Sequence, residues 1–121
     1  MKIFLVEDSD MILGHLRRTV SEVPGAAVIA EAAGQDDAIA GIAAHCPDVV
    51  ILDLALAAGS GIEVLRRIRP LHPALRIIVL TNKNAPQYRS KCLALGADLF
   101  LDKSRDFETL AQHLAALQTR R

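Results

Sequence analysis

Residues 49–53 read Val-Val-Ile-Leu-Asp, a short apolar run that ends in a carboxylate. The run is continuous rather than alternating, which is typical of a strand covered on both faces in a parallel sheet. Three other runs have this character, and a fourth is weaker. The strong runs are residues 3–6, 77–80 and 99–101, and the weaker one is residues 28–32. We therefore expect up to five buried strands.

Stretches with helical spacing separate these runs. Their apolar residues recur every three or four positions, at 12, 13, 16, 20 and 23, at 39, 42, 43 and 46, at 62, 65 and 68, and at 107, 110, 111, 114 and 117. Most of the glycines and prolines fall between the periodic stretches, as expected for turns. Regular alternation of strand and helix predicts an α/β fold, in which an open, doubly wound parallel sheet carries helices on both faces.

The length and charge limit the classes of protein. With 121 residues we expect one domain over residues 1–121. Fourteen basic residues balance fourteen acidic ones, which argues against a broad surface for nucleic acid or anionic lipid. No apolar run is long enough to cross a bilayer, and Glu7 and Asp8 interrupt the N-terminal run too early for a signal peptide. We expect a cytoplasmic protein with Cys46 and Cys92 as reduced, partly buried thiols.

Polar side chains follow four of the predicted strands. They are Glu7 with Asp8, Asp53, Thr81 and Lys103. The carboxyl ends of parallel strands share one edge, where open α/β sheets bind ligands. Each residue alone has an ordinary alternative role, as when Asp8 or Ser9 caps the first helix. Together, three carboxylates at one edge repel one another and raise their own pKa values, which favours a bound cation. Mg²⁺ prefers oxygen ligands, and Asp8 and Asp53 could supply them.

In this order and on these strand ends, the same residues resemble the receiver domain of two-component response regulators. The segment 53–63, Asp-Leu-Ala-Leu-Ala-Ala-Gly-Ser-Gly-Ile-Glu, also resembles the loop that follows the phosphorylated aspartate in that family. The likeness covers nearly the whole chain. It implies a flavodoxin-like fold with five parallel strands in the order 2-1-3-4-5.

The resemblance also implies a reaction. Asp53 would accept a phosphoryl group from the phosphohistidine of a sensor histidine kinase or phosphotransfer protein. Asp8, Asp53 and the backbone carbonyl of Ala55 would hold Mg²⁺, and Glu7 would reach it through water. Lys103 would stabilise the transferred group. Such a domain is not an enzyme in the usual sense, since it promotes only its own phosphorylation and dephosphorylation.

A switch is implied as well. The Thr81 hydroxyl would bond the new phosphate, and Phe100 would turn inward to fill the space that Thr81 leaves. The alternative for Phe100 is a permanently buried ring of the core. The surface of the fourth helix, residues 86–95, with the fifth strand and the last helix, would then bind a downstream protein or form a phosphorylation-dependent dimer. We expect no direct binding of nucleic acid or membrane by this chain.

Three positions depart from the family pattern. Ala57 stands where proline is usual, which should leave the loop after Asp53 less stiff. Asn82 stands where a very small residue is common, which should narrow access to the acyl phosphate. Ser104 stands where proline, often cis, is typical; we expect a trans bond after Lys103 and a cap on the last helix from Ser104 or Asp106.

Other classes of protein remain alternatives. An aspartate-nucleophile phosphatase needs a second acid two residues after the nucleophile, where this chain has Ala55. A flavodoxin-like cofactor module would place a phosphate after the first strand, where Glu7 and Asp8 would repel it. The chain could also be the receiver half of a DNA-binding transcriptional regulator, with Arg120 and Arg121 as the start of a linker, although we favour a single-domain receiver that acts through protein contact.

Overall fold

The structure is a computed structural model and describes residues 1–119. The expected Arg120–Arg121 tail lies outside the described residues. None of the helices in the described part of the chain is long and apolar enough to cross a membrane.

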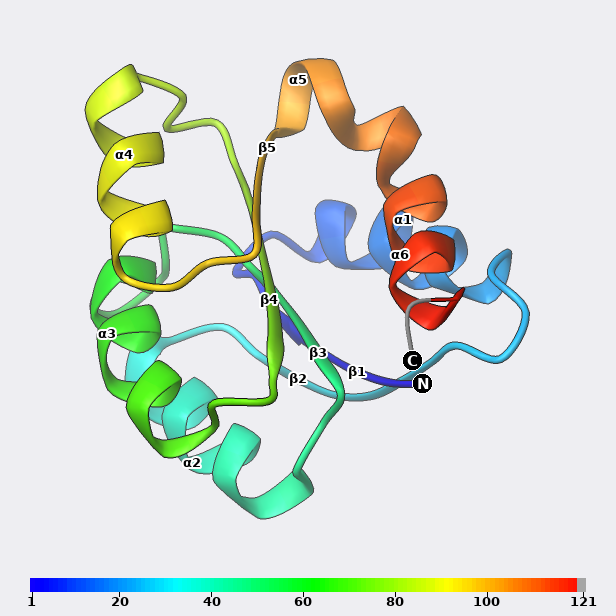
Figure 1. The fold of residues 1–121 in the computed structure, drawn as a ribbon, viewed down its shortest axis with the longest axis horizontal. Coiled ribbons are helices and arrows are strands. Elements are labelled where there is room, and N and C mark those ends of the chain that lie inside the picture. Colours follow the sequence, from blue (N-terminus) through cyan, green and yellow to red (C-terminus); the bar gives the residue numbers. More distant parts are fainter. Residues whose placement is uncertain (120–121) are drawn as a thin grey trace.

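Five parallel strands form one sheet in the order β2-β1-β3-β4-β5, which confirms the predicted fold class (Figure 1). The strands are β1 (Lys2–Val6), β2 (Ala27–Ala32), β3 (Val49–Leu52), β4 (Arg76–Thr81) and β5 (Leu99–Asp102). The weaker apolar run is therefore a true strand, and it lies at an edge of the sheet beside β1. Because every strand runs the same way, the residues that follow β1, β3, β4 and β5 meet at one edge.

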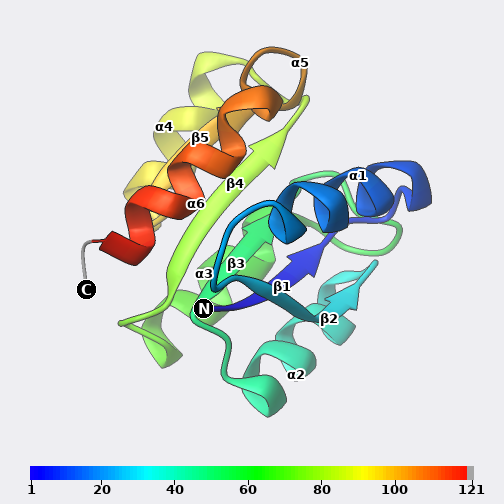
Figure 2. The same cartoon turned by 90° about the vertical axis from the view of Figure 1, so that its right-hand side faces the viewer.

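Helices cover both faces of the sheet, as Figures 1 and 2 show. α1 (Asp10–Ser21) and α6 (Leu110–Thr119) lie side by side on one face, and α2 (Gln35–His45), α3 (Gly61–Leu71) and α4 (Pro86–Ala94) cover the other. Alternate residues of β3 serve the two cores: Val50 and Leu52 pack toward α3, and Val49 and Ile51 toward α1 and α6. Burial of each such side chain stabilises the fold by about 1.5 to 3 kcal/mol.

The helices that precede and follow β4 in the sequence, α3 and α4, are buried to different extents. α3 buries four residues, Gly61, Val64, Leu65 and Ile68, whereas Cys92 is the one buried residue of α4. The Ser60 hydroxyl caps α3 by accepting from the N–H of Ile62, and Ala85 at the start of α4 makes no side-chain cap. Side-chain burial and capping both hold α3 more firmly than α4.

Arg69 ties the other end of α4 to its neighbours. Its Nε donates to the carbonyl of Gly96, just after α4, at 3.1 Å, and its Nη1 donates to the carbonyl of Leu75 at 2.8 Å. Its Nη2 lies 3.2 Å from the Asp98 carboxylate. The C-terminal end of α4 is therefore anchored although its N-terminal end lacks a cap.

The segment after β5 differs from the single last helix that the spacing predicted. A short helix α5 (Lys103–Asp106) and a 3₁₀ turn η1 (Phe107–Thr109) precede α6. The peptide bond after Lys103 is trans, as expected. The predicted cap was wrong: Asp102 caps α5 by accepting from the N–H of Ser104 at 2.9 Å. Asp106 instead accepts from the N–H of Asp102 at 2.8 Å, because the chain turns back within four residues.

Candidate functional site

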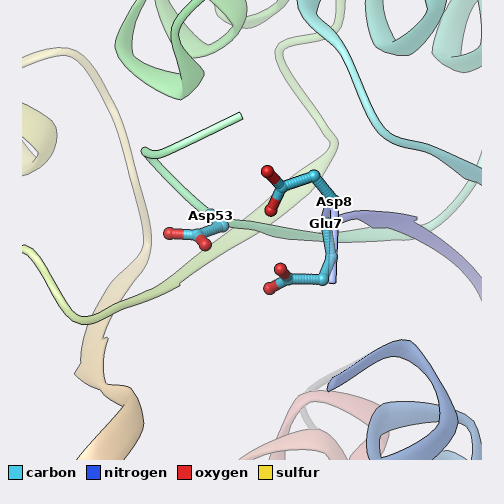
Figure 3. Close-up of side chains that lie close together, drawn as sticks. All are labelled: Glu7, Asp8 and Asp53. Atoms are coloured by element: carbon cyan, nitrogen blue, oxygen red, sulfur yellow. The ribbon is translucent and has the colours of Figure 1, made fainter. Parts of the chain in front are cut away.

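The ends of β1 and β3 bring three carboxylates together. Val6 and Leu52 are paired in the sheet, so Glu7 and Asp53 follow on adjacent strands. The N–H of Asp53 donates to the carbonyl of Val6 at 3.0 Å, which continues the pairing by one residue. Glu7, Asp8 and Asp53 form the acidic cluster, and one oxygen from each lies within 4.8 Å of the others (Figure 3). The structure thus brings these three predicted residues to one place.

Lys103 lies against two of these acids. Its Nζ is 2.7 Å from a Glu7 oxygen and 2.7 Å from a Asp53 oxygen. Burial alone would lower the pKa of Lys103, but its hydrogen bonds to Asp53 and Glu7 and their charges outweigh burial and raise the pKa above the ordinary value. Lys103 is therefore a firmly protonated cation between two carboxylates.

Burial sets the protonation of Glu7 more than crowding does. The side chain is 2% exposed, and burial raises its pKa, although Lys103 and the N–H of Ser9 oppose the rise. Repulsion from Asp53 makes only the smallest contribution, so mutual repulsion is a minor cause of the raised pKa. Lys103 sits between the two acids and offsets their charge, which the sequence argument had not taken into account.

Asp8 is the exposed member of the acidic cluster. Ser9, rather than Asp8, caps α1 by accepting from the N–H of Ile12 at 3.3 Å. The capping alternative for Asp8 is thereby removed, and its carboxylate is left to face Glu7 and Asp53 at the edge of the sheet (Figure 3).

The loop after Asp53 is closed on itself. Ala55 and Ser60 form an antiparallel bridge, and the N–H of Gly61 donates to the carbonyl of Leu54 at 3.0 Å. A Cβ at position 61 would lie 2.0 Å from the carbonyl oxygen of Asp53, so glycine is required there. The N–H of Ala55 also lies 3.3 Å from an Asp53 oxygen. Ala55 is therefore held beside the acidic cluster.

Three hydrogen bonds, which we call the loop latch, join this loop to the start of α2. The N–H of Ala57 donates to Ala33 O at 3.2 Å, and the N–H of Gln35 donates to Ala58 O at 2.9 Å. The N–H of Ser60 donates to Gln35 Oε1 at 2.9 Å. Ala57 was expected to loosen this loop, but proline at that position has no N–H and could not make the first bond.

Thr81 ends β4 on the other side of Asp53. It is fully buried, and its Oγ1 accepts from the N–H of Lys83 at 3.1 Å. Asn84, three residues further on, donates to the Asp102 carboxylate at 2.8 Å and so joins the β4–α4 loop, residues 82–85, to the end of β5. Asn82 in this loop is exposed. The described contacts of the loop thus run largely through side chains.

Phe100 lies inside the core. Its side chain packs with the residues under α3 and α4 and is 6% exposed. Arg89 of α4 covers it: the guanidinium lies 6.0 Å from the ring centre, and Nη1 donates to the carbonyl of Phe100 at 3.2 Å. This buried position is also the one that a permanent core ring would have, and the inward movement expected for the switch stays a prediction.

The donors at this edge fit a hard divalent cation. Carboxylate and carbonyl oxygens are what Mg²⁺ takes from proteins, together with water. Asp8 and Asp53 offer such oxygens beside Ala55, and Glu7 stands behind them, engaged with Lys103. The residues therefore fit a magnesium site.

Three residues at this edge were missed by sequence reasoning. Gln35, Asn84 and Asp102 each bond a residue distant in the chain or across a turn. None belongs to a motif. Only the position of Asp102, directly before Lys103, offered a signal, as a polar residue at the end of an apolar strand.

A five-stranded sheet of this order, with an acidic cluster and a lysine at its carboxyl edge, defines the class of flavodoxin-like receiver domains. A family model for the response regulator receiver domain matches residues 3–115. The chain belongs to the response regulator receiver domain family.

Proteins of known name that are similar to this chain are also response regulators. The transcriptional regulatory protein PhoP of Escherichia coli K12 is 30% identical over 120 residues, which is 99% of this chain and 53% of PhoP. A LuxR-family two-component response regulator from Aurantimonas has a solved structure with 34% identity and a TM-score of 0.90, covering 99% of this chain and 86% of that one. The chain spans about half the length of the curated relatives it matches.

A solved structure of RcsB from Salmonella enterica serovar Typhimurium is also similar. It has 28% identity and a TM-score of 0.87, and the match covers 97% of this chain and 67% of RcsB. RcsB is bound there to the promoter rprA in the presence of the phosphomimetic BeF3⁻. The promoter and the phosphomimetic are components of the RcsB structure.

Proposed function

We propose that this chain is a phosphorylation switch in which Asp53 accepts a phosphoryl group from the phosphohistidine of a sensor kinase or phosphotransfer protein. One observation carries the proposal: the Lys103 ammonium lies 2.7 Å from the Asp53 carboxylate, within the acidic cluster. A fixed cation beside a carboxylate nucleophile is the arrangement that phosphoryl transfer needs, because that reaction depends on positioning and charge neutralisation.

The proposed reaction transfers the phosphoryl group from an imidazole nitrogen to Asp53 and then to water. An Asp53 oxygen forms a bond to phosphorus as the bond between phosphorus and the imidazole nitrogen breaks, and the electron pair stays on the imidazole. Lys103 moves from pairing with a carboxylate to pairing with the phosphoryl oxygens. Water later cleaves the acyl phosphate, which releases inorganic phosphate and restores Asp53. The domain promotes these two steps on itself and is not a free-standing enzyme.

Mg²⁺ is the cofactor we propose, held by Asp8, Asp53 and the backbone carbonyl of Ala55, with Glu7 acting through water. When bound it would neutralise charge on the phosphoryl oxygens. Asp8, as the exposed acid, keeps the entrance to the site negative and attracts the cation. Lys103 leaves the cluster with a net negative charge, since one ammonium faces three carboxylates.

The output is proposed to pass through α4, β5 and α6. The Thr81 hydroxyl would exchange its bond to the N–H of Lys83 for one to the phosphate, which draws the β4–α4 loop inward. Phe100 lies next in line, under Arg89 of α4. A downstream protein, or a second copy of the chain, would read the altered surface. These reactions belong in the cytoplasm, where sensor kinases have their ATP.

A second candidate rests on the lengths of the relatives. PhoP is a transcriptional regulator and the RcsB structure includes a promoter, and the chain covers 53% and 67% of them. In this reading the chain is the receiver part of a DNA-binding regulator, and phosphorylation controls that second part. The intact mass of the protein isolated from its native cell distinguishes the two candidates.

The reaction is tested by intact-mass spectrometry of purified protein with Mg²⁺ and acetyl phosphate or phosphoramidate. Wild type should gain one phosphoryl group, and Asp53→Asn should gain none because the amide is not a nucleophile here. Asp37→Asn, an exposed acid on α2, is the matched control and should label like wild type. Equal labelling of Asp53→Asn and wild type, or no labelling of wild type by any of these donors or a matched kinase, removes the proposal.

A further inference from the structure

Gln35 is the one side chain in the loop latch. It begins α2, and its Oε1 accepts from the N–H of Ser60 at 2.9 Å while its own N–H donates to the carbonyl of Ala58 at 2.9 Å. The side chain lies across Gly59, where a Cβ would come within 2.3 Å of Oε1 and where φ is +78°. Glycine at 59 therefore leaves the room that Gln35 occupies.

Ser60 connects Gln35 to the site. Ser60 and Ala55 form the antiparallel bridge of the loop, so the position of one backbone fixes that of the other. Ala55 in turn lies beside Asp53, with its N–H 3.3 Å from the carboxylate. A continuous set of contacts thus runs from Gln35 through Ser60 and Ala55 to Asp53.

Apart from the backbone hydrogen bonds already described, little else holds the tip of this loop. Its residues from Ala57 to Gly59 are exposed, so buried apolar contacts do not hold the tip. Gly34, the residue before α2, makes no side-chain cap, so Gln35 is the polar side chain that joins the two segments. An amide also accepts a hydrogen bond without adding charge next to Asp36 and Asp37 in the first turn of α2.

We infer that Gln35 is a positioning residue for the metal site: its side chain fixes Ser60, and through it directs the backbone of Ala55 toward the acidic cluster. This inference rests on the proposed function, because it assigns Gln35 to the same magnesium site. It predicts that removal of the acceptor oxygen weakens Mg²⁺ binding without removal of any ligand. Residues that orient metal ligands commonly change metal affinity by about 10- to 100-fold.

The test compares two substitutions of nearly equal size. Gln35→Met removes the acceptor oxygen, and Gln35→Glu keeps it. Gln112→Met, on the exposed side of α6 across the sheet, is the matched control. Each protein is titrated with Mg²⁺ while Tm is followed, and the exchange of the Ser60 amide hydrogen is measured by NMR without metal. Physiological ionic strength screens charges beyond about 8 Å, which limits the effect of the added charge in Gln35→Glu.

Gln35→Met should lose protection of the Ser60 amide and need about 10-fold more Mg²⁺ for the same rise in Tm, the low end of the range for such residues. Gln35→Glu and Gln112→Met should remain close to wild type. The inference is overturned if Ser60 exchanges faster in Gln35→Met while the Mg²⁺ requirement is unchanged, since the bond is then merely structural. It is also overturned if Ser60 stays protected. If wild type shows no Mg²⁺-dependent rise at all, the metal part of the proposed function fails first, and the positioning role with it.

Discussion

The β3–α3 loop and the β4–α4 loop both border Asp53, but they are held by different groups. Three backbone hydrogen bonds hold the first, from Ala57 to Ala33, from Gln35 to Ala58 and from Gly61 to Leu54, and the Gln35 side chain adds one bond, to the N–H of Ser60. Side chains contribute the described ties of the second, through Thr81 Oγ1 and Asn84. The helices that follow differ in the same sense, because α3 buries four residues and α4 buries Cys92 alone.

This difference suits the two tasks proposed for the site. The Ala55 carbonyl, proposed as a metal ligand, would work best in a fixed place, and the β3–α3 loop provides one. A readout must change position at small cost, and regions with few buried contacts open most easily. The β4–α4 loop and the N-terminal end of α4 have this character, while Arg69 anchors the far end of the helix.

The largest effect is expected from an added methyl group in the fixed loop. Gly61→Ala would place a Cβ 2.0 Å from the carbonyl oxygen of Asp53, so the loop must open. The free energy of unfolding should fall by more than about 3 kcal/mol, and Asp53 should no longer be labelled. Urea denaturation measures the first effect. Gly14→Ala is the control: no atom outside the adjacent backbone of α1 lies within 4 Å of the new Cβ, and the helix α1 should gain up to about 1 kcal/mol. A Gly61→Ala protein as stable as wild type would contradict the fixed-loop view.

Binding of Mg²⁺ should depend on the fixed side of the site only. At ten times Kd the ion stabilises the native state by about 1.4 kcal/mol, which should raise Tm by roughly 4 to 6 °C for a domain of this size. Asp8→Ala and Asp53→Ala should lose most of this rise, because each removes a ligand. Asn84→Ala, in the β4–α4 loop, should keep it. Thermal melts with EDTA and with excess Mg²⁺ decide the matter, and equal shifts in all four proteins would show that the acids share no metal.

Removing the cap of α3 and adding a cap to α4 should reduce the difference in stability between the two helices. Ser60→Ala removes the cap of α3 and should lower stability by about 1 kcal/mol. Ala85→Ser offers a hydroxyl to α4, where the backbone is already extended at φ −60° and ψ 144°, and should raise stability by about 0.5 kcal/mol or more. Amide hydrogen exchange in α4 should slow in Ala85→Ser. Unchanged exchange there would mean that the missing cap is not what leaves this end of α4 open.

The smallest effect concerns the tie between Asn84 and Asp102. Hydrogen bonds from Ser104 and then Asn84 lower the pKa of Asp102 below its ordinary value of about 3.9. The contribution of this carboxylate to stability is therefore complete above the ordinary pKa and is lost as pH falls through the lower, folded pKa. In Asn84→Ala the pKa should rise, as an NMR titration of the carboxyl carbon would show. The difference in stability between the two proteins should be present at pH 6 and vanish in strong acid. A difference that persists in strong acid, where Asp102 is protonated in both the folded and the unfolded protein, would trace to packing instead.

Much of the fold followed from hydrophobic pattern. The run at residues 49–52 is β3 to the residue, and the other strong runs lie within β1, β4 and β5. Patterns of this kind are informative because burial on both faces leaves little choice of residue. The end of the chain was less predictable. Phe107 fits the period of the last helix, but the turn that Asp102 and Asp106 make leaves it in a 3₁₀ turn before α6.

The site was predictable to the extent that strand ends place it. Glu7, Asp8, Asp53 and Lys103 meet because their strands are parallel, and that follows from the pattern. The roles of Gln35 and Asn84 did not follow, since each side chain meets a partner that the chain reaches only after folding. The pairing of Lys103 with both Glu7 and Asp53 was also missed, because the sequence does not distinguish a buried lysine from a solvated one.

The burial of Cys92 has a consequence for kinetics. Its thiol lies within the core and burial raises its pKa, so a thiol reagent reaches it only when α4 lifts from the sheet. Cys46 is exposed, so its alkylation requires no opening of the structure and serves as the reference. The ratio of the Cys92 to the Cys46 alkylation rate therefore reports how often α4 separates from the sheet. The two cysteines therefore allow the proposed signalling motion of α4 to be followed in the wild-type protein.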